Sequence, residues 1–533
     1  MTKIKSVNSN TSILIGEGSN YIIPDVTTDN PTTNGTNLVN AYAAAVALNS
    51  ANGLSLSSTN RFTILLMSSM YQLATNALNL NTQYIDIVGI SDNAESTILT
   101  STGNTVLQNA DNVWIKNCYI TTTSISGDFA YTIPASTSYN NQLMENVIFY
   151  QTSDNGKFMQ AGSTYEYSGI YKKIKANVTG GNARLFGGGS TASGTFIDCD
   201  SYNTGTGNNA SFGGGTSGVA SGTFTNCMAY TNTGNISAFS GGTGGVASGI
   251  FINCKTHILN SSPNNNFSFG GGDAGIASGT FTGCTVYFDG SGTGGLFAFG
   301  GYTAGGSATG IFNDCTTTMV GTSTNANRSF ASIASGTFTK CTVNSSYTTY
   351  SFGNDTASGT FTNCITNSTQ NSGSFGYVTA SGTFNNCIVT STAGANNSFG
   401  AANAGVASGT FTNCISISNS EDESFGSSNN DNGTCSGTFF NIKKTGRLNT
   451  IFTGTLRDSE ITALGTNYDG ITNIRTSARI FNCTIKSNGT GKSLNSSLAG
   501  QTPAIAYSRF NSAYGANVTD GLSTNYNIID ALI

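Results

Sequence analysis

The chain has few charged side chains and very few histidine, tryptophan and proline residues. Of its 533 residues, 9% are charged, and it holds 1 His, 1 Trp and 5 Pro with a net charge of −5. Its 21 Lys and Arg residues are spread thinly, so no basic patch indicates a nucleic-acid partner. His257 has no second imidazole to act with, which favours a surface or turn position over a catalytic role.

Long apolar runs are also missing. No segment approaches the ~20 apolar residues of a membrane-spanning helix, so we expect no membrane insertion. Lys3 and Lys5 stand near the start, but the apolar core of a secretory signal does not follow them, so we expect any export to use another route. With 37% hydrophobic residues and 67 Gly, the chain is too apolar and aromatic to be disordered.

What the sequence does contain is a repeated phrase, Ala-Ser-Gly-Thr-Phe-Thr-Asn-Cys, which stands whole at 220–227, 357–364 and 407–414. A Cys three residues after a Phe recurs every 23 to 31 residues. These cysteines are Cys199, Cys227, Cys254, Cys284, Cys315, Cys341, Cys364, Cys387 and Cys414. A second Phe precedes each phrase, at Phe186, Phe212, Phe239, Phe269, Phe299, Phe330, Phe352, Phe375, Phe399 and Phe425. A repeat of this length predicts stacked structural units.

The short runs rich in Phe, Ile, Val and Thr predict β-strands, because Gly, Asn and Ser bound them and helical periodicity is absent. One repeat cannot bury its own apolar face, so each must cover the next, with strands paired in parallel ~4.8 Å apart. The variable repeat length favours a solenoid, whose turns accept insertions. We therefore predict an all-β, single-stranded, right-handed parallel β-helix with an N-terminal capping helix.

Phe and Cys, three residues apart, would point to opposite faces of a straight strand, so a bend must lie between them. The intervening Asn tolerates left-handed backbone, which predicts three stacked columns of Phe, Asn and Cys around one corner. The Cys column extends in both directions with other residues in the same slot. Its further members are Cys118, Val147, Ile174, Ile442, Ser459, Cys483 and Ser508.

Because Val and Ile share this slot, we interpret the 12 cysteines as reduced thiols of the core. Their spacing has no Cys-x-x-Cys pair of the kind that binds metal, although stacked positions are close enough for a disulfide. Cys435 stands at the Ala of the phrase, outside the column, and is the one thiol singled out for reactivity.

The domain boundaries follow from the ends of the repeat. Residues 1–60 are predicted to form an N-terminal cap or attachment segment, with a turn at Asp29-Asn30-Pro31 and a helix at 37–49. Residues 61–454 form the β-helix, and residues 455–533, which are richer in mixed charge, form C-terminal coils and a capping or docking region. Strands after the helix are expected at 61–68, near 71–73, at 83–89 and at 97–100.

The order of these first elements, a helix, a strand, a Tyr-x-Leu segment and a strand ending in Ile-Val-Gly, resembles the first coils of pectin-lyase-like parallel β-helix proteins. Viral tail spikes and fibres are a large branch of that superfamily. Asn112-Val-Trp-Ile-Lys-Asn-Cys118 is similar to the Val-Trp-Ile-Asp-His segment of pectate lyases, but Lys116 and Asn117 stand where that motif has Asp and His. The polygalacturonase and pectin methylesterase signatures are absent. The resemblance therefore implies the fold without pectin chemistry.

Other candidate groups have simpler interpretations. Acid pairs on this fold can hydrolyse glycosides, so the carboxylates are the main candidates. Asp198 and Asp314 occupy the Asn position of the bend, and Asp200 follows a core Cys. The run Glu421-Asp422-Glu423 fits a solvated turn. The Gly-Gly-Gly runs fit turns better than phosphate loops, because no helix or Lys follows them. They lie at 187–189, 213–215 and 270–272. We expect no catalytic, cofactor-binding or metal residues.

Three functions remain open. The first is a virion structural protein of the tail-fibre, spike or decoration type that presents a surface to a host, with carbohydrate as the expected ligand. The second is a polysaccharide-degrading spike enzyme, a hydrolase or lyase. The third is a bacterial surface adhesin or filament subunit, located at the cell surface rather than in a virion. The first predicts a homo-oligomer, favoured as a trimer, with other virion proteins and host polysaccharide as partners. Tyrosines in or near turns are the candidates for stacking on sugars. They are Tyr165, Tyr167, Tyr230, Tyr347 and Tyr350.

Overall fold

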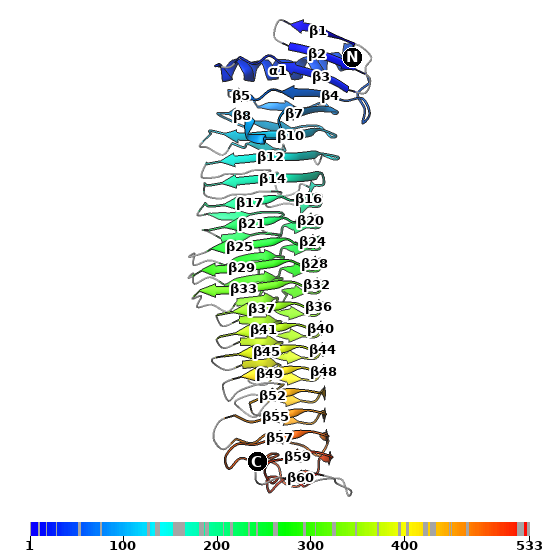
Figure 1. The fold of residues 1–533 in the computed structure, drawn as a ribbon, viewed down its shortest axis with the longest axis vertical. Helices are drawn as coiled ribbons and strands as arrows, with labels where there is room; N and C mark the ends of the chain where they lie inside the picture. The colour runs from blue at the N-terminus through cyan, green and yellow to red at the C-terminus, as the bar shows by residue number, and fades with distance from the viewer. Residues whose placement is uncertain are drawn as a thin grey trace. The chain divides into compact units, whose positions relative to one another are not determined.

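The structure, a computed structural model, divides into two compact units, Met1–Asn260 (unit 1) and Ser261–Ile533 (unit 2). Each is described by itself, and within each the strands lie one above another (Figure 1). The residues described are 2–8, 11–16, 19–27, 29–51, 55–74, 77–124, 128–133, 139–152, 166–180, 186, 191–205, 207–213, 217–232, 235–240, 244–259, 265–290, 295–303, 305–321, 327–346, 349–369, 372–392, 396–400, 405–418, 425–426, 433–446, 448, 450–464, 468–519 and 527–529. The predicted domain boundaries at 60 and 454 stay predictions.

Unit 1 begins with three antiparallel strands, β1 (Thr2–Asn8), β2 (Thr11–Gly16) and β3 (Ser19–Pro24). Strand β3 then pairs in parallel with β4 (Phe62–Leu66), which starts the solenoid. The single helix among the described residues, α1 (Pro31–Ala51), packs on β3 and on β5 (Ser69–Gln72). It buries the side chains of Leu38, Ala41, Tyr42 and Ala45. This helix contacts the first strands, as expected of a cap.

The helix starts earlier than the sequence analysis placed it. The turn predicted at Asp29-Asn30-Pro31 is present at Asp29, where the Asn30 N–H donates to Thr27 O at 3.3 Å, but Pro31 is already the first helical residue. The Asn30 side chain accepts a hydrogen bond from the backbone N–H of Thr33 at 3.0 Å. Asn before the helix and Pro at its first position are typical of a helix start, since Asn satisfies a free N–H and Pro lacks one.

In unit 1 the solenoid strands pair in parallel with those one coil away. The long strands β10 (Trp114–Thr122), β12 (Leu143–Gln151) and β14 (Ile170–Val178) each continue through the corner, although the pairing skips the corner residues Asn117, Asn146 and Lys173. The predicted strands at 61–68, near 71–73, at 83–89 and at 97–100 are confirmed. The other elements of this unit are β6 (Leu78–Leu80), β7 (Ile85–Gly89), the 3-10 helix η1 (Ala94–Ser96), β8 (Thr97–Ser101), β9 (Val106–Gln108), β11 (Tyr131–Thr132), β13 (Glu166–Tyr167), β15 (Thr191–Ala192), β16 (Thr195–Ile197), β17 (Asp200–Asn203), β18 (Asn208–Ala210), β19 (Val219–Ala220), β20 (Thr223–Thr225), β21 (Met228–Thr231), β22 (Asn235–Ser237), β23 (Val246–Ala247), β24 (Ile250–Ile252) and β25 (Lys255–Leu259).

In unit 2 the first coils repeat four short strands, of which one carries the Phe of the phrase and the next follows the Cys. Toward the C-terminus the coils have fewer strands. The strands are β26 (Asn266–Phe269), β27 (Ile276–Ala277), β28 (Thr280–Thr282), β29 (Thr285–Gly290), β30 (Leu296–Phe299), β31 (Ser307–Ala308), β32 (Ile311–Asn313), β33 (Thr316–Gly321), β34 (Asn327–Phe330), β35 (Ile333–Ala334), β36 (Thr337–Thr339), β37 (Thr342–Ser345), β38 (Thr349–Phe352), β39 (Thr356–Ala357), β40 (Thr360–Thr362), β41 (Ile365–Ser368), β42 (Ser372–Phe375), β43 (Thr379–Ala380), β44 (Thr383–Asn385), β45 (Ile388–Ser391), β46 (Asn396–Phe399), β47 (Val406–Ala407), β48 (Thr410–Thr412), β49 (Ile415–Ser418), β50 (Thr434–Cys435), β51 (Thr438–Phe440), β52 (Lys443–Thr445), β53 (Ile451–Phe452), β54 (Thr455–Arg457), β55 (Glu460–Thr462), β56 (Arg479–Phe481), β57 (Thr484–Lys486), β58 (Ala504–Ala506), β59 (Arg509–Phe510) and β60 (Ile528–Ile529).

The corner predicted at the Asn of the phrase is confirmed. Asn386 has φ of 54°, so its backbone is left-handed, and Phe384 before it and Cys387 after it are both buried. Its side-chain amide donates to the Asn363 side chain at 3.1 Å and accepts from that of Asn413 at 3.0 Å. Asp198 and Asp314 have φ of 53° and 54°, which confirms that they replace Asn at the bend.

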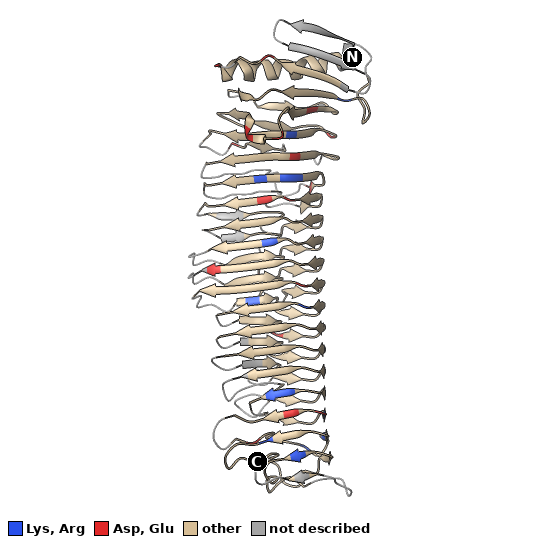
Figure 2. Ribbon diagram, in the orientation of Figure 1, with Lys and Arg blue, Asp and Glu red and all other residues tan. Residues whose placement is uncertain are grey.

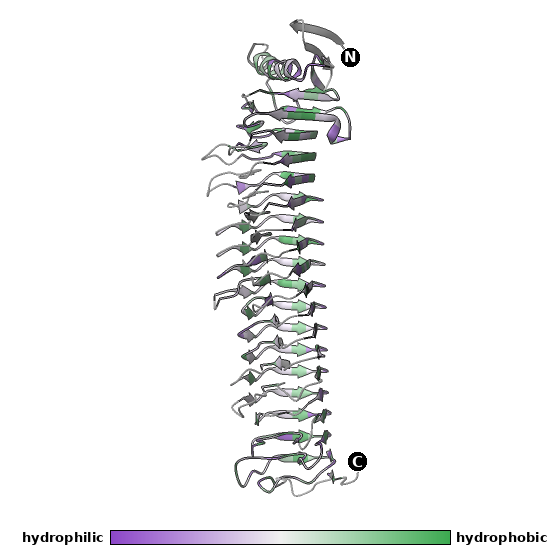
Figure 3. Cartoon of the chain, turned by 90° about the vertical axis from the view of Figure 1, so that its left-hand side faces the viewer, coloured by the Kyte–Doolittle hydropathy of each residue, from purple (hydrophilic) through white to green (hydrophobic). Residues whose placement is uncertain are grey.

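The core is built from two columns of Phe rings that face each other. Phe361 stacks on Phe338 at 4.8 Å and on Phe384 at 4.9 Å between ring centroids. The second column meets it edge to face, with Phe352 at 5.7 Å and Phe375 at 5.5 Å. These are the offset-stacked and edge-to-face geometries that aromatic rings prefer. In unit 2, apolar residues recur at corresponding places on successive strands (Figure 3).

Every cysteine of the chain is buried as a reduced thiol, which confirms the interpretation as core thiols. A thiol of this column also donates to a main-chain carbonyl of the preceding coil, as Cys387 Sγ does to Phe361 O at 3.5 Å. Cys435 is fully buried in the Ala column beside Ala407, so the structure gives no support for singling it out as reactive. The extended register is confirmed by the pairing of Cys118 with Val147 and of Val147 with Ile174.

Burial should protect these thiols from modification in the folded protein. Burial raises the pKa of Cys118 and of Cys483 to about 12, against about 8.5 for a free thiol. A thiol-specific disulfide reagent at pH 8 should label none of the 12 cysteines before denaturation and all of them after it. Burial raises the pKa of Cys118 and Cys483 in the folded protein relative to the unfolded chain. Their contribution to the free energy of unfolding is therefore complete below pH ~8.5 and is lost as the pH rises toward 12. Rapid labelling of native protein would contradict this assignment.

Candidate functional site

An open groove of about 480 Å³ lies over outward-facing positions of β4, β7 and β10 in unit 1. In a half-buried strand, alternate side chains point away from the core, so these three strands present one row of side chains from each coil. The groove is lined by Tyr21, Ser58, Thr59, Arg61, Thr63, Leu65, Asp86, Val88, Trp114 and Lys116. Among them are the one Trp of the chain and three charged side chains.

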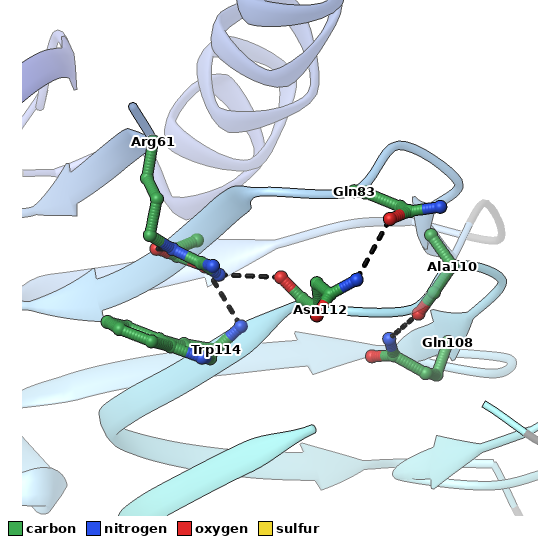
Figure 4. A network of polar contacts seen from close by, with 7 residues as sticks. Arg61, Gln83, Gln108, Ala110, Asn112 and Trp114 are labelled. Atoms are coloured by element: carbon green, nitrogen blue, oxygen red, sulfur yellow. Dashed lines mark hydrogen bonds and ion pairs between the residues drawn. The ribbon is translucent and has the colours of Figure 1, made fainter. Parts of the chain in front are cut away.

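A buried ion pair forms the base of this groove. The Arg61 guanidinium donates to both carboxylate oxygens of Asp86, at 2.6 Å from Nε and 2.5 Å from Nη2. It also donates to the backbone carbonyl of Asn112 at 2.6 Å (Figure 4). Asp86 accepts a third hydrogen bond, from the Trp114 backbone N–H at 2.9 Å. The bidentate geometry holds both side chains in one orientation.

The Trp114 ring lies against two cations. The Arg61 guanidinium carbon is 3.9 Å from the centre of the indole, and Lys116 Nζ is 5.3 Å from it. Arg61 also lies 5.3 Å from the Tyr84 ring. Lys116 pairs with Glu145 on the neighbouring coil at 3.1 Å. The half-buried Trp114 is therefore fixed by cation–π contacts, and the planar guanidinium stacked on it extends its surface.

The carboxylates of the groove are engaged in structural contacts. Burial raises the pKa of Asp86, and the Arg61 hydrogen bonds and charge oppose that rise. Asp86 is 2% exposed and Glu145 is held by Lys116, so neither is presented as a free acid beside an ionised partner. Glycoside hydrolysis needs two such carboxyl groups on either side of a bond.

The residues that replace the pectate lyase Asp and His have structural contacts. Asn117 has φ of 55° and lies at the corner, where its amide donates to Gly89 O at 3.2 Å and the Asn146 amide donates to its oxygen at 2.9 Å. It therefore belongs to the Asn column. Lys116 points outward into the groove.

The other candidate groups are separated from this groove. Asp200 is half-buried, which raises its pKa, and the Tyr202 hydroxyl lies 3.5 Å from its carboxylate. His257 lies on β25 and not in a turn, with its ring 5.3 Å from that of Tyr230. Gly270 has φ of 63°, consistent with a turn. The acidic run 421–423 and the glycines 187–189 lie outside the described residues.

The tyrosines proposed for sugar stacking are not gathered in turns. Tyr167 is completely buried, so its proposed role in stacking on sugars was wrong. Tyr230 and Tyr350 are half-buried and lie on strands β21 and β38. Tyr165 and Tyr347 fall outside the described residues.

Charged residues are sparse on the described strands (Figure 2). Within the described part of the chain, no cluster of three or more His, Cys, Asp or Glu side chains is placed to hold a metal ion. In that same part, α1 is the long helix, and it is not apolar enough to cross a membrane.

Sequence reasoning missed Arg61 and Asp86, which lie 25 residues apart in neighbouring coils. The available signal was the lone Trp in the segment 112–118, whose neighbours one coil away include Asp86. Fold and groove together define a parallel β-solenoid with an outward-facing site on its first coils. No protein-family model, no curated protein and no solved structure matches the chain.

Proposed function

We propose that this chain is a virion structural protein of the tail-fibre, spike or decoration type, and that it binds carbohydrate on a host surface through the groove at Trp114. The observation that carries the proposal is the stacked pair of Trp114 and Arg61 in an open groove, held by the buried Asp86. A flat, fixed aromatic surface binds the apolar face of a sugar ring with little loss of conformational freedom.

The polar side chains around this pair support the same ligand. Tyr21, Ser58, Thr59 and Thr63 line the groove and offer hydroxyl groups, each of which can both donate and accept a hydrogen bond. Ser58 and Thr59 are exposed. Sugar hydroxyls need such partners at several points, because unpaired polar groups weaken binding.

The virion part of the proposal rests on the resemblance of the element order to viral β-helix spikes. It includes a homo-oligomer, with a trimer favoured, and contacts with other virion proteins. The engaged carboxylates of the groove favour binding over cleavage, although the spike-enzyme alternative uses the same fold. An adhesin or filament subunit at a bacterial cell surface is the other alternative.

Replacing Trp114 by Ala should weaken retention on host surface glycan about tenfold, because one aromatic stacking contact is removed. The measurement is retention of purified protein on immobilised host glycan, with the chain length of the released glycan followed in parallel. Tyr507→Ala is the matched control, because Tyr507 is an aromatic residue that is 63% exposed and lies in unit 2. Its retention should equal that of the unmodified protein.

Shortened glycan would favour the enzyme alternative. Retention unchanged by Trp114→Ala would exclude this groove as the binding site. Detection of the chain in purified virus particles, with its stoichiometry, tests the virion assignment separately. Light scattering of the full-length protein tests the trimer.

A further inference from the structure

A second column of unusual side chains lies on the outside of unit 2. On strands β26, β30, β34, β38, β42 and β46, the residues two positions before the core Phe follow one another in the pairing of successive coils. The register pairs these residues in one continuous line. They are Phe267, Phe297, Arg328, Tyr350, Gly373 and Asn397. Phe267, Arg328 and Tyr350 are half-buried and Phe297 is 3% exposed, so three aromatic rings and a cation pack against one another along this column.

Arg328 sits in the middle of this column, surrounded by aromatic rings. Its guanidinium carbon is 5.9 Å from the ring centre of Phe297, 5.6 Å from that of Tyr302 and 5.7 Å from that of Tyr350. The cluster extends on one side, where Phe297 stacks on Phe267 at 5.5 Å. Arg328 is thus placed at the centre of an aromatic surface.

The same cluster continues through two side chains that come from turns. Tyr302 stacks on Phe297 at 4.7 Å, and Tyr377 meets Tyr350 edge to face at 5.1 Å. Gly373 leaves the space for this second contact. A Cβ there would lie 2.8 Å from a ring carbon of Tyr350 and 2.9 Å from Tyr377. The aromatic surface therefore spans several coils.

Arg328 forms no ion pair with the described residues. Within the described residues no carboxylate lies within ion-pair distance of it, and its buried Nε has no hydrogen-bond partner. The nearby Asp355 is engaged by the Ser332 hydroxyl at 2.6 Å and by the Asn354 amide at 3.0 Å. Burial disfavours the Arg328 charge, which Asp355 attracts only from beyond ion-pair distance, and the adjacent positions show that Phe or Tyr fits this column. Packing alone does not explain an arginine here.

We propose that the column around Arg328 is a binding site for an acidic oligosaccharide, in which Arg328 pairs with a sugar carboxylate and the rings of Tyr302 and Tyr350 stack on the sugars beside it. This rests on the proposed carbohydrate-binding function and adds a site distinct from the Trp114 groove. Arginine suits the role because its planar fork binds a carboxylate through two parallel hydrogen bonds while it stacks on aromatic faces.

The test uses the full-length protein and three acidic probes, namely oligogalacturonate, oligoglucuronate and sialyllactose, each beside its carboxyl-reduced neutral form. Affinities are measured by titration calorimetry. We expect at least one acidic probe to bind about tenfold or more tightly than its neutral form, and Arg328→Gln to abolish that difference. Arg328→Lys keeps the charge without the planar fork and should retain part of it.

Tyr507→Ala, an exposed aromatic residue outside both sites, is the control and should leave the preference for the acidic probe unchanged. Circular dichroism and thermal melting establish that each variant is folded, and Tyr350→Ala provides a second variant should Arg328→Gln fail to fold. Equal binding of acidic and neutral forms, no binding of any probe, or a preference that survives in the folded Arg328→Gln or Tyr350→Ala variant would overturn the site. Acid-selective binding without host-glycan retention at Trp114 would overturn the proposed function and leave this site standing.

Discussion

Replacing Phe361 by Ala is expected to lower the free energy of unfolding by ~3–5 kcal/mol. Phe361 is completely buried and touches rings above, below and beside it in both Phe columns. The parallel ladders on either side limit collapse of the backbone into the space, so most of the cavity should remain. Urea denaturation, followed by circular dichroism and by near-ultraviolet signals that do not come from tryptophan, measures the change in the free energy of unfolding.

Thr362→Ala is the matched control for this substitution. Thr362 lies next to Phe361 on β40 but points outward and is partly exposed, so its loss should change the free energy of unfolding by ~0.5 kcal/mol or less. A loss below ~1 kcal/mol for Phe361→Ala would mean that the Phe column is not a packed core.

Replacing Asp86 by Ala should destabilise unit 1 by ~3–5 kcal/mol. The change leaves the Arg61 guanidinium, whose side chain is 11% exposed, without its counter-ion and removes the acceptor of the Trp114 backbone N–H. Thermal or urea denaturation monitored by Trp114 fluorescence reports on this unit directly, because Trp114 is the one Trp of the chain.

A double-mutant cycle separates the pair from its surroundings. The double variant Arg61→Met, Asp86→Leu removes both charges. It should lower the free energy of unfolding by less than Asp86→Ala alone, since no buried charge is left unpaired. Lys116→Ala breaks the more exposed pair with Glu145 and should cost ~1 kcal/mol or less. An Asp86→Ala variant as stable as Lys116→Ala would show that the Arg61–Asp86 pair is not buried in solution.

Most of the fold could be predicted from the repeat, because its sequence pattern is local and recurs. A Phe, an Asn and a Cys at fixed spacing specify an inward ring, a left-handed bend and an inward thiol, and each coil then needs only to stack on its copy. The start of α1 was misplaced for a local reason as well, since Asn30-Pro31 can begin a helix or form a turn, and its contacts with β3 and β5 favour the helix.

The sequence by itself determined the parallel β-solenoid, the inward Phe and Cys columns, the Asn corner and the reduced state of the thiols. Only the tertiary structure decided which outward side chains meet. Arg61, Asp86 and Trp114 come together because three coils bring residues 25 and 28 positions apart into one row. Arg328 meets Phe297 and Tyr350 in the same way. Coil lengths vary through their turns, so the outward rows follow from the stacking register, which no single repeat specifies.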